Sequence, residues 1–180
     1  MISDEELLRR YRRGSGEAFA ELFARYREPL FGFFYRRVFD RERAEDLAQE
    51  VFVAVMKARD RYDPRAPVRG YLYGIALKMA MAERRKQAFR KTDWLSAEPG
   101  AESDYDSSLA VRKALSLLQE SEREMVMLRE YEQLSYAEMA VLLDIPVNTV
   151  RSRLFRARMQ LKRYLEPVEA ALGREDGTCS

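Results

Sequence analysis

Side chains suited to contacting nucleic acid are concentrated between residues 145 and 165. This segment contains six arginines and lysines and no acidic residue. Each basic side chain that neutralises a phosphate releases counterions, so a run of this kind favours nucleic acid. A basic run alone is more typical of the solvated face of an amphipathic helix. The polar and basic residues that we expect to face duplex DNA are Asn148, Thr149, Arg151, Ser152, Arg153, Arg156 and Arg158.

The surrounding pattern predicts a helix-turn-helix. Ser135 and Glu138 have the spacing of a capping box, which opens a short helix with Met139, Leu142 and Leu143 facing inward. Asp144-Ile145-Pro146 ends that helix, because proline cannot continue a helix but can begin the next one. The apolar stripe of the second helix is Val147, Val150, Leu154, Ala157, Leu161 and Leu165. Two such helices joined by a short turn fit the DNA major groove, so we expect DNA binding here.

Polar side chains of a different kind lie near residue 47. In a helix predicted over Ala44 to Arg59, Leu47, Val51 and Val55 face inward. The side chains that project outward are Asp46, Gln49 and Glu50. Acidic residues in the first turns of a helix already favour the helix dipole. They also offer several directed acceptors to an arginine-rich partner, and we favour this second interpretation.

Several kinds of chemistry lack the residues that they need. The chain of 180 residues contains no histidine, and its one cysteine is Cys179 in a polar C-terminal tail. It shows neither a phosphate-binding glycine-rich loop nor a nucleophile elbow. We therefore expect no catalytic activity, no metal and no cofactor. No apolar run reaches the length of a membrane span and the first residues are acidic, so we expect a soluble protein of the reducing cytosol.

Hydrophobic residues make up 47% of the chain and recur at helical spacing, which predicts an all-α protein. A capping box at Ser3 and Glu6 opens the first helix, and the second carries an apolar and aromatic stripe from Phe19 to Phe33. A turn is expected at 40–43, a loop at 60–70 and a further helix from Tyr71 to about Arg90. We expect two small helical domains, at 1–91 and 109–165, joined by a flexible acidic linker at 92–108 and followed by a frayed tail at 166–180.

Two motifs resemble those of a known family. The residues Ala44-Glu45-Asp46-Leu47-Ala48-Gln49-Glu50-Val51-Phe52 resemble the signature of domain 2 in the extracytoplasmic-function (group IV) sigma factors of the sigma-70 family. The segments Leu134 to Ala140 and Ile145 to Leu154 resemble domain 4 of the same family. The resemblance covers roughly residues 14–90 and 109–165, with the acidic linker where the family has one.

The resemblance implies a sigma factor, which lends promoter recognition to bacterial RNA polymerase. Asp46, Gln49 and Glu50 would dock on the clamp helices of the largest polymerase subunit, and the polymerase flap is a further implied contact. Domain 4 would read the −35 element as duplex, and the acidic linker would run through the polymerase cleft. An anti-sigma partner is also implied, although no residue identifies it.

Domain 2 would capture the −10 element as it melts. Aromatic rings interleaved with basic residues suit single-stranded DNA, because bases stack on the rings while arginines hold the phosphates. The alternative is that Tyr71 and Tyr73 belong to the core, which for Tyr71 is equally favoured. The residues expected at the −10 element are Arg61, Tyr62, Arg65, Arg69, Tyr71, Tyr73, Lys78, Arg84 and Arg85.

The chain departs from the family pattern where bases would be recognised. Tyr71 stands where the family usually has Trp, Gly74 for Arg, Lys78 for Asn, and Glu83 for Asp. In the recognition helix, Asn148 replaces a common Gly and Phe155 a common His. These departures leave the preferred promoter sequence open. The rival hypothesis is a stand-alone helix-turn-helix regulator, which leaves the motif at 44–52 without an explanation; a helical enzyme is a distant third.

Overall fold

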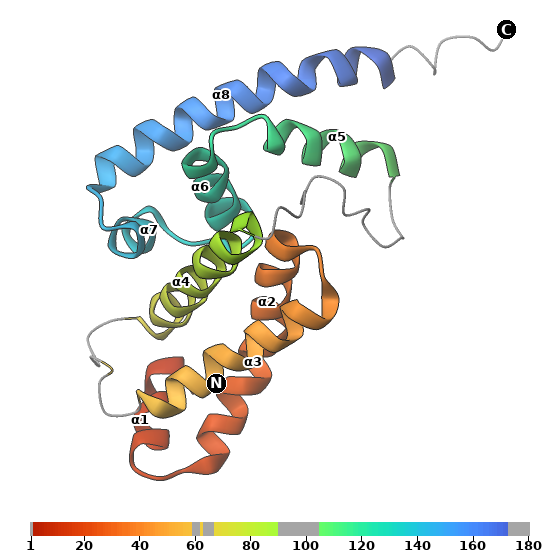
Figure 1. Cartoon of the computed structure of the whole chain (residues 1–180). Helices are drawn as coiled ribbons and strands as arrows, with labels where there is room; N and C mark the ends of the chain where they lie inside the picture. The colour runs from red at the N-terminus through yellow and green to blue at the C-terminus, as the bar shows by residue number, and fades with distance from the viewer. Residues whose placement is uncertain (1, 59–61, 63–66, 90–104, 173–180) are drawn as a thin grey trace, which may run out of the picture. The chain divides into compact units, whose positions relative to one another are not determined.

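The computed structural model describes residues 2–58, 62, 67–89 and 105–172, and every regular element in these residues is an α-helix (Figure 1). This confirms the all-α prediction. The chain divides into two compact units, Met1–Pro99 and Gly100–Ser180. Most of the predicted linker and the end of the predicted tail, with Cys179, lie outside the described residues.

The described residues of the first unit form four helices, and the first three begin at an identifiable local signal. Ser3, Ser15 and Asp40 act as N-caps, their side chains accepting hydrogen bonds from backbone N–H groups of the first turn. The helices are α1 (Asp4–Arg12), α2 (Gly16–Val38), α3 (Arg41–Lys57) and α4 (Val68–Phe89).

The core of this unit lies where α2 meets α3 and α4. Leu30, Phe33 and Phe34 of α2 have no exposed surface, and the rings of Phe33 and Phe34 meet edge to face with centroids 5.2 Å apart. The apolar and aromatic stripe of α2 was predicted as core, and the burial of Leu22, Tyr26, Leu30 and Phe33 confirms this for most of it. Phe19 and Phe23, which are half-buried, complete the packing against Phe52 of α3.

The second unit contains α5 (Tyr105–Ser116), α6 (Glu120–Glu130), α7 (Tyr136–Leu143) and α8 (Val147–Leu172). The predicted capping box is present in full: Ser135 accepts from the N–H of Glu138, and the Glu138 carboxylate accepts from the N–H of Ser135. Asp144 then turns the chain with a φ of 52°. The helix-turn-helix predicted from the sequence is therefore confirmed as α7, a short turn and α8.

Several helix boundaries differ from the predictions. α3 begins at Arg41 instead of Ala44, because Asp40 is extended and caps the N–H of Arg43 at 2.9 Å. α4 begins at Val68, within the predicted loop, and α5 begins at Tyr105, within the predicted linker. α8 continues to Leu172, so the first part of the predicted frayed tail is helical.

The predicted capping box at the start of α1 is present only in part. Ser3 accepts from the N–H of Glu6 as expected. The Glu6 carboxylate, however, forms ion pairs with Arg9 and Arg10 one turn further along the helix. The hydrogen bond from Arg10 lowers the pKa of Glu6. Arginines at these positions compete for the carboxylate, which a two-residue capping pattern does not take into account.

A half-buried group of polar contacts fixes α1 to α2. The Tyr26 hydroxyl donates a hydrogen bond to Asp4 at 2.5 Å, and Arg25 forms an ion pair with the same carboxylate at 2.7 Å. Burial, followed by the contact with Asp4, raises the pKa of Tyr26 above its ordinary value of 10.0. The protonated hydroxyl is therefore part of the folded structure.

Replacing Tyr26 by Phe tests this contact through the pH dependence of stability. At pH 8 the variant loses one hydrogen bond, and we expect its free energy of unfolding to fall by about 1 kcal/mol. Because the pKa of Tyr26 is higher in the folded state than in the unfolded state, its contribution is present below pH 10 and is lost as the pH rises further. Urea unfolding followed by circular dichroism should show the difference between wild type and variant shrinking above pH 10; a constant difference contradicts this account.

Candidate functional site

The recognition helix α8 separates an apolar face from a polar and basic one. Val150, Leu154 and Ala157 are fully buried, as predicted. On the other faces, Thr149 and Arg153 are half-exposed. The remaining predicted DNA-facing residues are exposed, namely Asn148, Arg151, Ser152, Arg156 and Arg158. The helix thus presents hydrogen-bonding and cationic groups along its first three turns, where a helix-turn-helix meets base edges and phosphates.

Arg158 differs from the other arginines of α8, because it joins three helices of the second unit. It forms an ion pair with Glu130 of α6 at 2.5 Å and donates to the Tyr136 hydroxyl of α7 at 3.5 Å. Glu130 thereby raises the pKa of Arg158. Arg129 lies over the Tyr136 ring at 5.2 Å and donates to the carbonyl of Leu134 at 2.8 Å. These contacts hold the two helices of the helix-turn-helix against α6.

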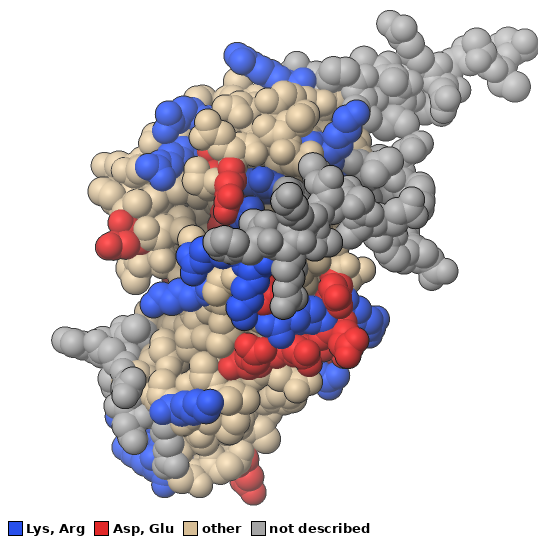
Figure 2. All heavy atoms as spheres, viewed as in Figure 1, with Lys and Arg blue, Asp and Glu red and all other residues tan. Residues whose placement is uncertain are grey.

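The predicted partner-binding side chains of α3 are all exposed. Leu47, Val51 and Val55 are almost completely buried, which leaves Asp46, Gln49 and Glu50 on the opposite side of the helix. Figure 2 shows a band of acidic side chains on the first unit, in the area where Figure 1 draws α3, with basic side chains beside it in this view. The geometry expected for these three residues is therefore present.

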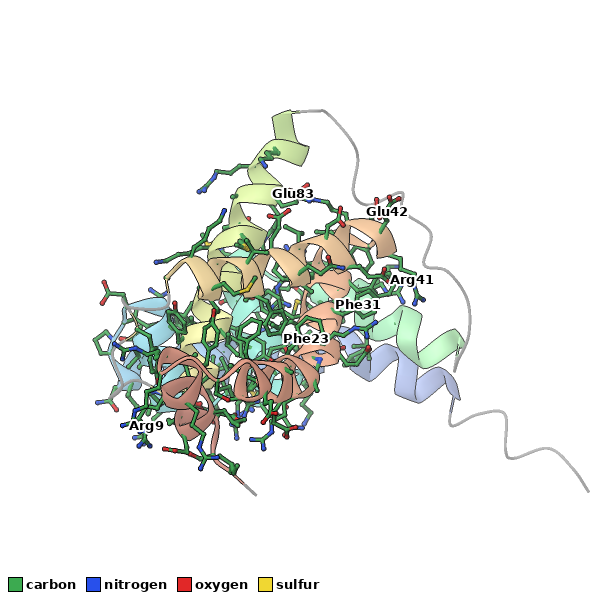
Figure 3. The ribbon with its side chains drawn as sticks, turned by 90° about the horizontal axis from the view of Figure 1, so that it is seen from below. Arg9, Phe23, Phe31, Arg41, Glu42 and Glu83 are labelled. Carbon is green, nitrogen blue, oxygen red and sulfur yellow. The ribbon has the colours of Figure 1, made fainter. Side chains whose placement is uncertain are left out.

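Arg43 connects this acidic face to α4. Its guanidinium forms an ion pair with Glu50 at 3.1 Å and another with Glu83 of α4 at 2.8 Å. The Glu83 side chain is 9% exposed, and Figure 3 shows it on the part of α4 that passes α3. The contacts with Glu83 and then Glu50 raise the pKa of Arg43. Arg43 thus pairs with a nearly buried carboxylate and also restrains one of the exposed ones.

The tyrosines predicted to contact single-stranded DNA lie at different depths. Tyr62 and Tyr73 are 4% and 2% exposed, and the Tyr73 ring packs 5.6 Å from that of Phe33 in the core. Tyr71 is half-buried, with its ring 5.1 Å from that of Tyr62, and its burial raises its pKa. Tyr71 is therefore the tyrosine of this group that retains accessible ring surface.

The basic residues predicted beside these tyrosines follow α4. Arg69 and Arg84 are half-exposed, and Lys78 and Arg85 are exposed. Arg69 lies 5.9 Å from the centre of the Tyr73 ring. Arg61 and Arg65 lie outside the described residues. The described basic residues of this group are spread along α4: Arg69 lies near its start beside Tyr71, Lys78 in its middle, and Arg84 and Arg85 near its end.

Two contributors to these surfaces were missed by the sequence interpretation. Arg43 was predicted to lie in a turn, and Glu83 was considered only as a departure from a family pattern. Their spacing of 40 residues carries no local signal. The sequence held two indications of this pairing: Arg43 is close to the acidic residues of α3, and Glu83 is a carboxylate on a largely apolar part of α4. Within the described residues no group of His, Cys, Asp and Glu has the arrangement of a metal site, and no helix is long and apolar enough to cross a membrane.

Comparisons with known proteins match both units. The model described as Sigma-70 region 2 matches residues 22–90, and that described as Sigma-70, region 4 matches residues 108–161. The RNA polymerase sigma-H factor of Pseudomonas aeruginosa is 31% identical, over 92% of this chain and 95% of that protein. The ECF RNA polymerase sigma-E factor of Escherichia coli K12 is 29% identical, over 93% and 96%. The structure of CnrH in complex with the cytosolic domain of CnrY aligns with a TM-score of 0.71 at 25% identity, over 92% of this chain and 99% of that one.

The link between Arg43 and Glu83 can be tested by stability measurements. Replacing Arg43 by Gln leaves a nearly buried carboxylate without this ion pair, and we expect the free energy of unfolding to fall by about 2 kcal/mol. Arg41 provides the matched control: its side chain is 79% exposed and pairs with Glu45 on the helix surface, so Arg41→Gln should cost less than about 0.5 kcal/mol. Adding Glu83→Gln to Arg43→Gln should restore part of the loss. Equal losses for the two arginine variants would refute the assignment.

Proposed function

The chain belongs to the extracytoplasmic-function group of the sigma-70 family, and we propose that it binds core RNA polymerase and directs transcription initiation at promoters with its own −10 and −35 elements. The observation that carries this proposal is the presence of regions 2 and 4 in order on one chain, with an exposed acidic helix face in the first and an exposed basic helix face in the second. In this role the protein acts as an initiation factor in the cytoplasm and catalyses no reaction.

We assign the −35 element to α8. Asn148, Arg151 and Ser152 lie in its first turns, where side chains reach base edges in the major groove. Arg153, Arg156 and Thr149 flank them and are suited to phosphates, which set the register of the helix on the duplex. For Arg158, the ion pair with Glu130 favours a positioning role between α6 and α8.

We assign the −10 element to α4 and the segment before it. Tyr71 supplies a ring face for a base of the melted strand, and Arg69, Lys78, Arg84 and Arg85 supply positive charge along the helix. The buried ring of Tyr62 supports Tyr71 from within the unit. Arg61 and Arg65 remain part of the proposal.

Asp46, Gln49 and Glu50 of α3 form the proposed polymerase contact, through charge-assisted hydrogen bonds to arginines of the largest subunit. With the first unit anchored in this way, polymerase holds two DNA-binding units on one chain. Contacts to two promoter elements then add through effective concentration, although each alone is weak. CnrH, a structural relative, forms a complex with the cytosolic domain of CnrY. We propose that this chain also has a protein partner, an anti-sigma factor that covers some of its surfaces.

The decisive assay is run-off transcription with bacterial core polymerase on a library of promoter fragments. We expect transcripts that appear only when the protein is added, and their shared upstream sequences define the two elements.

The polymerase contact is tested by measuring binding to core polymerase. Asp46→Asn combined with Glu50→Gln should lower the affinity for core polymerase at least about tenfold, because two charge-assisted contacts are weakened. Glu17→Gln combined with Glu28→Gln, which removes the same charge from exposed positions of α2, should leave it within about twofold.

Two outcomes contradict the proposal, one in the transcription assay and one in the measurement of polymerase affinity. If no transcript appears but the protein alone binds specific duplex sites, the stand-alone regulator is correct. If the variants of α2 and α3 lose polymerase affinity equally, the polymerase contact has been assigned to the wrong surface.

The proposed difference between Arg156 and Arg158 is measurable through salt dependence. We expect Arg156→Gln to reduce the slope of log K against log [salt] for −35 duplex binding by about 0.9, the loss of one phosphate contact. Arg158→Gln should change this slope much less, because Glu130 already neutralises this charge. Both slopes can be measured by fluorescence anisotropy of a labelled duplex at salt concentrations from about 50 to about 300 mM. Equal decreases would show that Arg158 also contacts a phosphate.

A further inference from the structure

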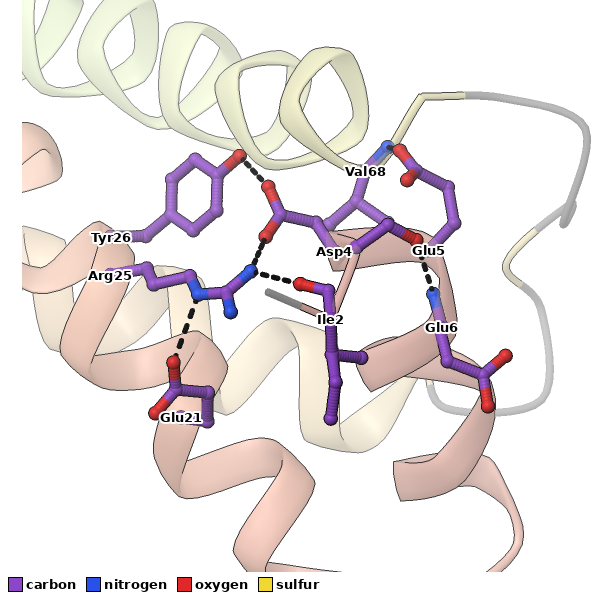
Figure 4. A network of polar contacts seen from close by, with 9 residues as sticks. Ile2, Asp4, Glu5, Glu6, Glu21, Arg25, Tyr26 and Val68 are labelled. Carbon is purple, nitrogen blue, oxygen red and sulfur yellow. Dashed lines mark hydrogen bonds and ion pairs between the residues drawn. The ribbon is translucent and has the colours of Figure 1, made fainter.

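Helix α1 lies outside the residues that the region 2 model matches, yet it contacts both α2 and α4. Leu7 and Leu8 are 2% and 1% exposed, which fixes the inner side of the helix to the unit. Its polar side chains make contacts far along the chain, several of which Figure 4 shows. One of them reaches the start of α4, three residues before Tyr71, and another reaches Tyr62, whose ring lies beside that of Tyr71.

The first of these contacts joins α1 to the start of α4. The Glu5 carboxylate accepts a hydrogen bond from the N–H of Val68 at 3.3 Å, across 63 positions of sequence (Figure 4). The first N–H groups of a helix have no partner within it, and the helix dipole favours negative charge at this end. Glu5 therefore does for α4, from another helix, what an N-cap side chain does locally. Val68 itself is fully buried, so core packing and this contact together hold the start of α4 in place.

The second contact joins the other end of α1 to Tyr62. Arg12 donates a hydrogen bond to the Tyr62 carbonyl at 3.4 Å. The Tyr62 ring is buried and lies 5.1 Å from the ring of Tyr71, with an angle of 56° between their planes. Displacement of the Tyr62 backbone would move the ring against which Tyr71 packs.

α1 is itself held firmly enough to act as a support. Asp4 accepts from both Arg25 and Tyr26, and Arg25 also donates to the carbonyl of Ile2 at 2.7 Å. Arg25 is further oriented by Glu21 at 3.1 Å. The start of α1 is thus tied to the middle of α2, and the Glu5 and Arg12 contacts act from a fixed position.

We propose that α1 is a positioning element for capture of the −10 strand: Glu5 and Arg12 set the places of Val68 and Tyr62, and through them the place of the Tyr71 ring. This inference rests on the proposed role of Tyr71 at the −10 element. Stacking of a base requires the ring to be held at a defined place and angle, and a support formed from another helix provides this before DNA arrives.

The test measures binding of a fluorescent single-stranded oligonucleotide with the −10 sequence to holoenzyme formed from the full chain. We expect Glu5→Ala combined with Arg12→Ala to weaken this binding about five- to tenfold and to slow open-complex formation on duplex promoter more than on a pre-melted one. Glu5→Gln combined with Arg12→Lys, which keeps one acceptor and one donor, should recover part of the affinity. Glu6→Ala is the matched control, because its carboxylate pairs only with Arg9 and Arg10 among the contacts described above, and it should bind like wild type.

Two further measurements separate this proposal from a loss of folding and from failure of the proposed function. Affinity for core polymerase and for −35 duplex should stay within about twofold of wild type in every α1 variant. Tyr71→Ala, measured in parallel, should weaken −10 strand binding at least as strongly as the α1 double variant. If Tyr71→Ala weakens binding and the α1 variants do not, the positioning role is refuted while the function stands. If Tyr71→Ala has no effect, the assignment of Tyr71 fails and the inference with it.

Discussion

The apolar stripe of α3, formed by the buried side chains of Leu47, Val51 and Val55, determines where the charged side chains of this helix lie. A helix that buries residues at spacings of three and four must present the intervening residues on its other side. The same constraint places Asn148, Arg151 and Ser152 of α8 outward once Val150, Leu154 and Ala157 are buried. Each proposed interface is the side of a helix that core packing leaves exposed. The two faces nevertheless differ in chemistry, because α3 exposes acids and the first eighteen residues of α8, to Tyr164, contain none.

The near balance of 32 basic and 30 acidic residues conceals this separation of charge, and the ion pairs refine it further. Burial of the Glu83 carboxylate is unfavourable unless a cation compensates it, and Arg43 does so while also pairing with Glu50. Glu50 is 50% exposed and Glu83 is 9% exposed, so Arg43 is anchored at its inner partner and shared at the outer one. A partner arginine that approaches α3 competes with Arg43 for Glu50 but not for Glu83. In the proposed polymerase contact, Glu50 would therefore exchange partners while the ion pair between Arg43 and Glu83 still joins α3 to α4.

Local sequence signals predicted the parts of the fold that depend on neighbouring residues. Ser135 with Glu138, and the stripe through Val150 and Leu154, follow from spacing alone, and the structure confirms both. The start of α4 was placed three residues late, because the carboxylate that accepts from Val68 belongs to Glu5. Tyr71 and Tyr73 lie two residues apart and both were predicted to contact DNA, but packing against Phe33 buries Tyr73. The pairing of Arg158 with Glu130 could not be foreseen for the same reason: it depends on how α6 packs on α8, and helical periodicity does not contain this information.

The contacts proposed at each promoter element are individually weak, and two weak DNA-binding units on one chain favour sites that carry both elements. Arg151 and Arg156 are exposed, and an exposed charged contact contributes little free energy and loses more of it as salt rises. Either unit alone would therefore leave DNA readily, which suits a factor that must locate a promoter and later release it. Specificity then comes from requiring both elements at once while polymerase holds both units, since the second contact is made at high effective concentration. A tighter recognition helix would weaken this requirement, because one element alone would then suffice for binding.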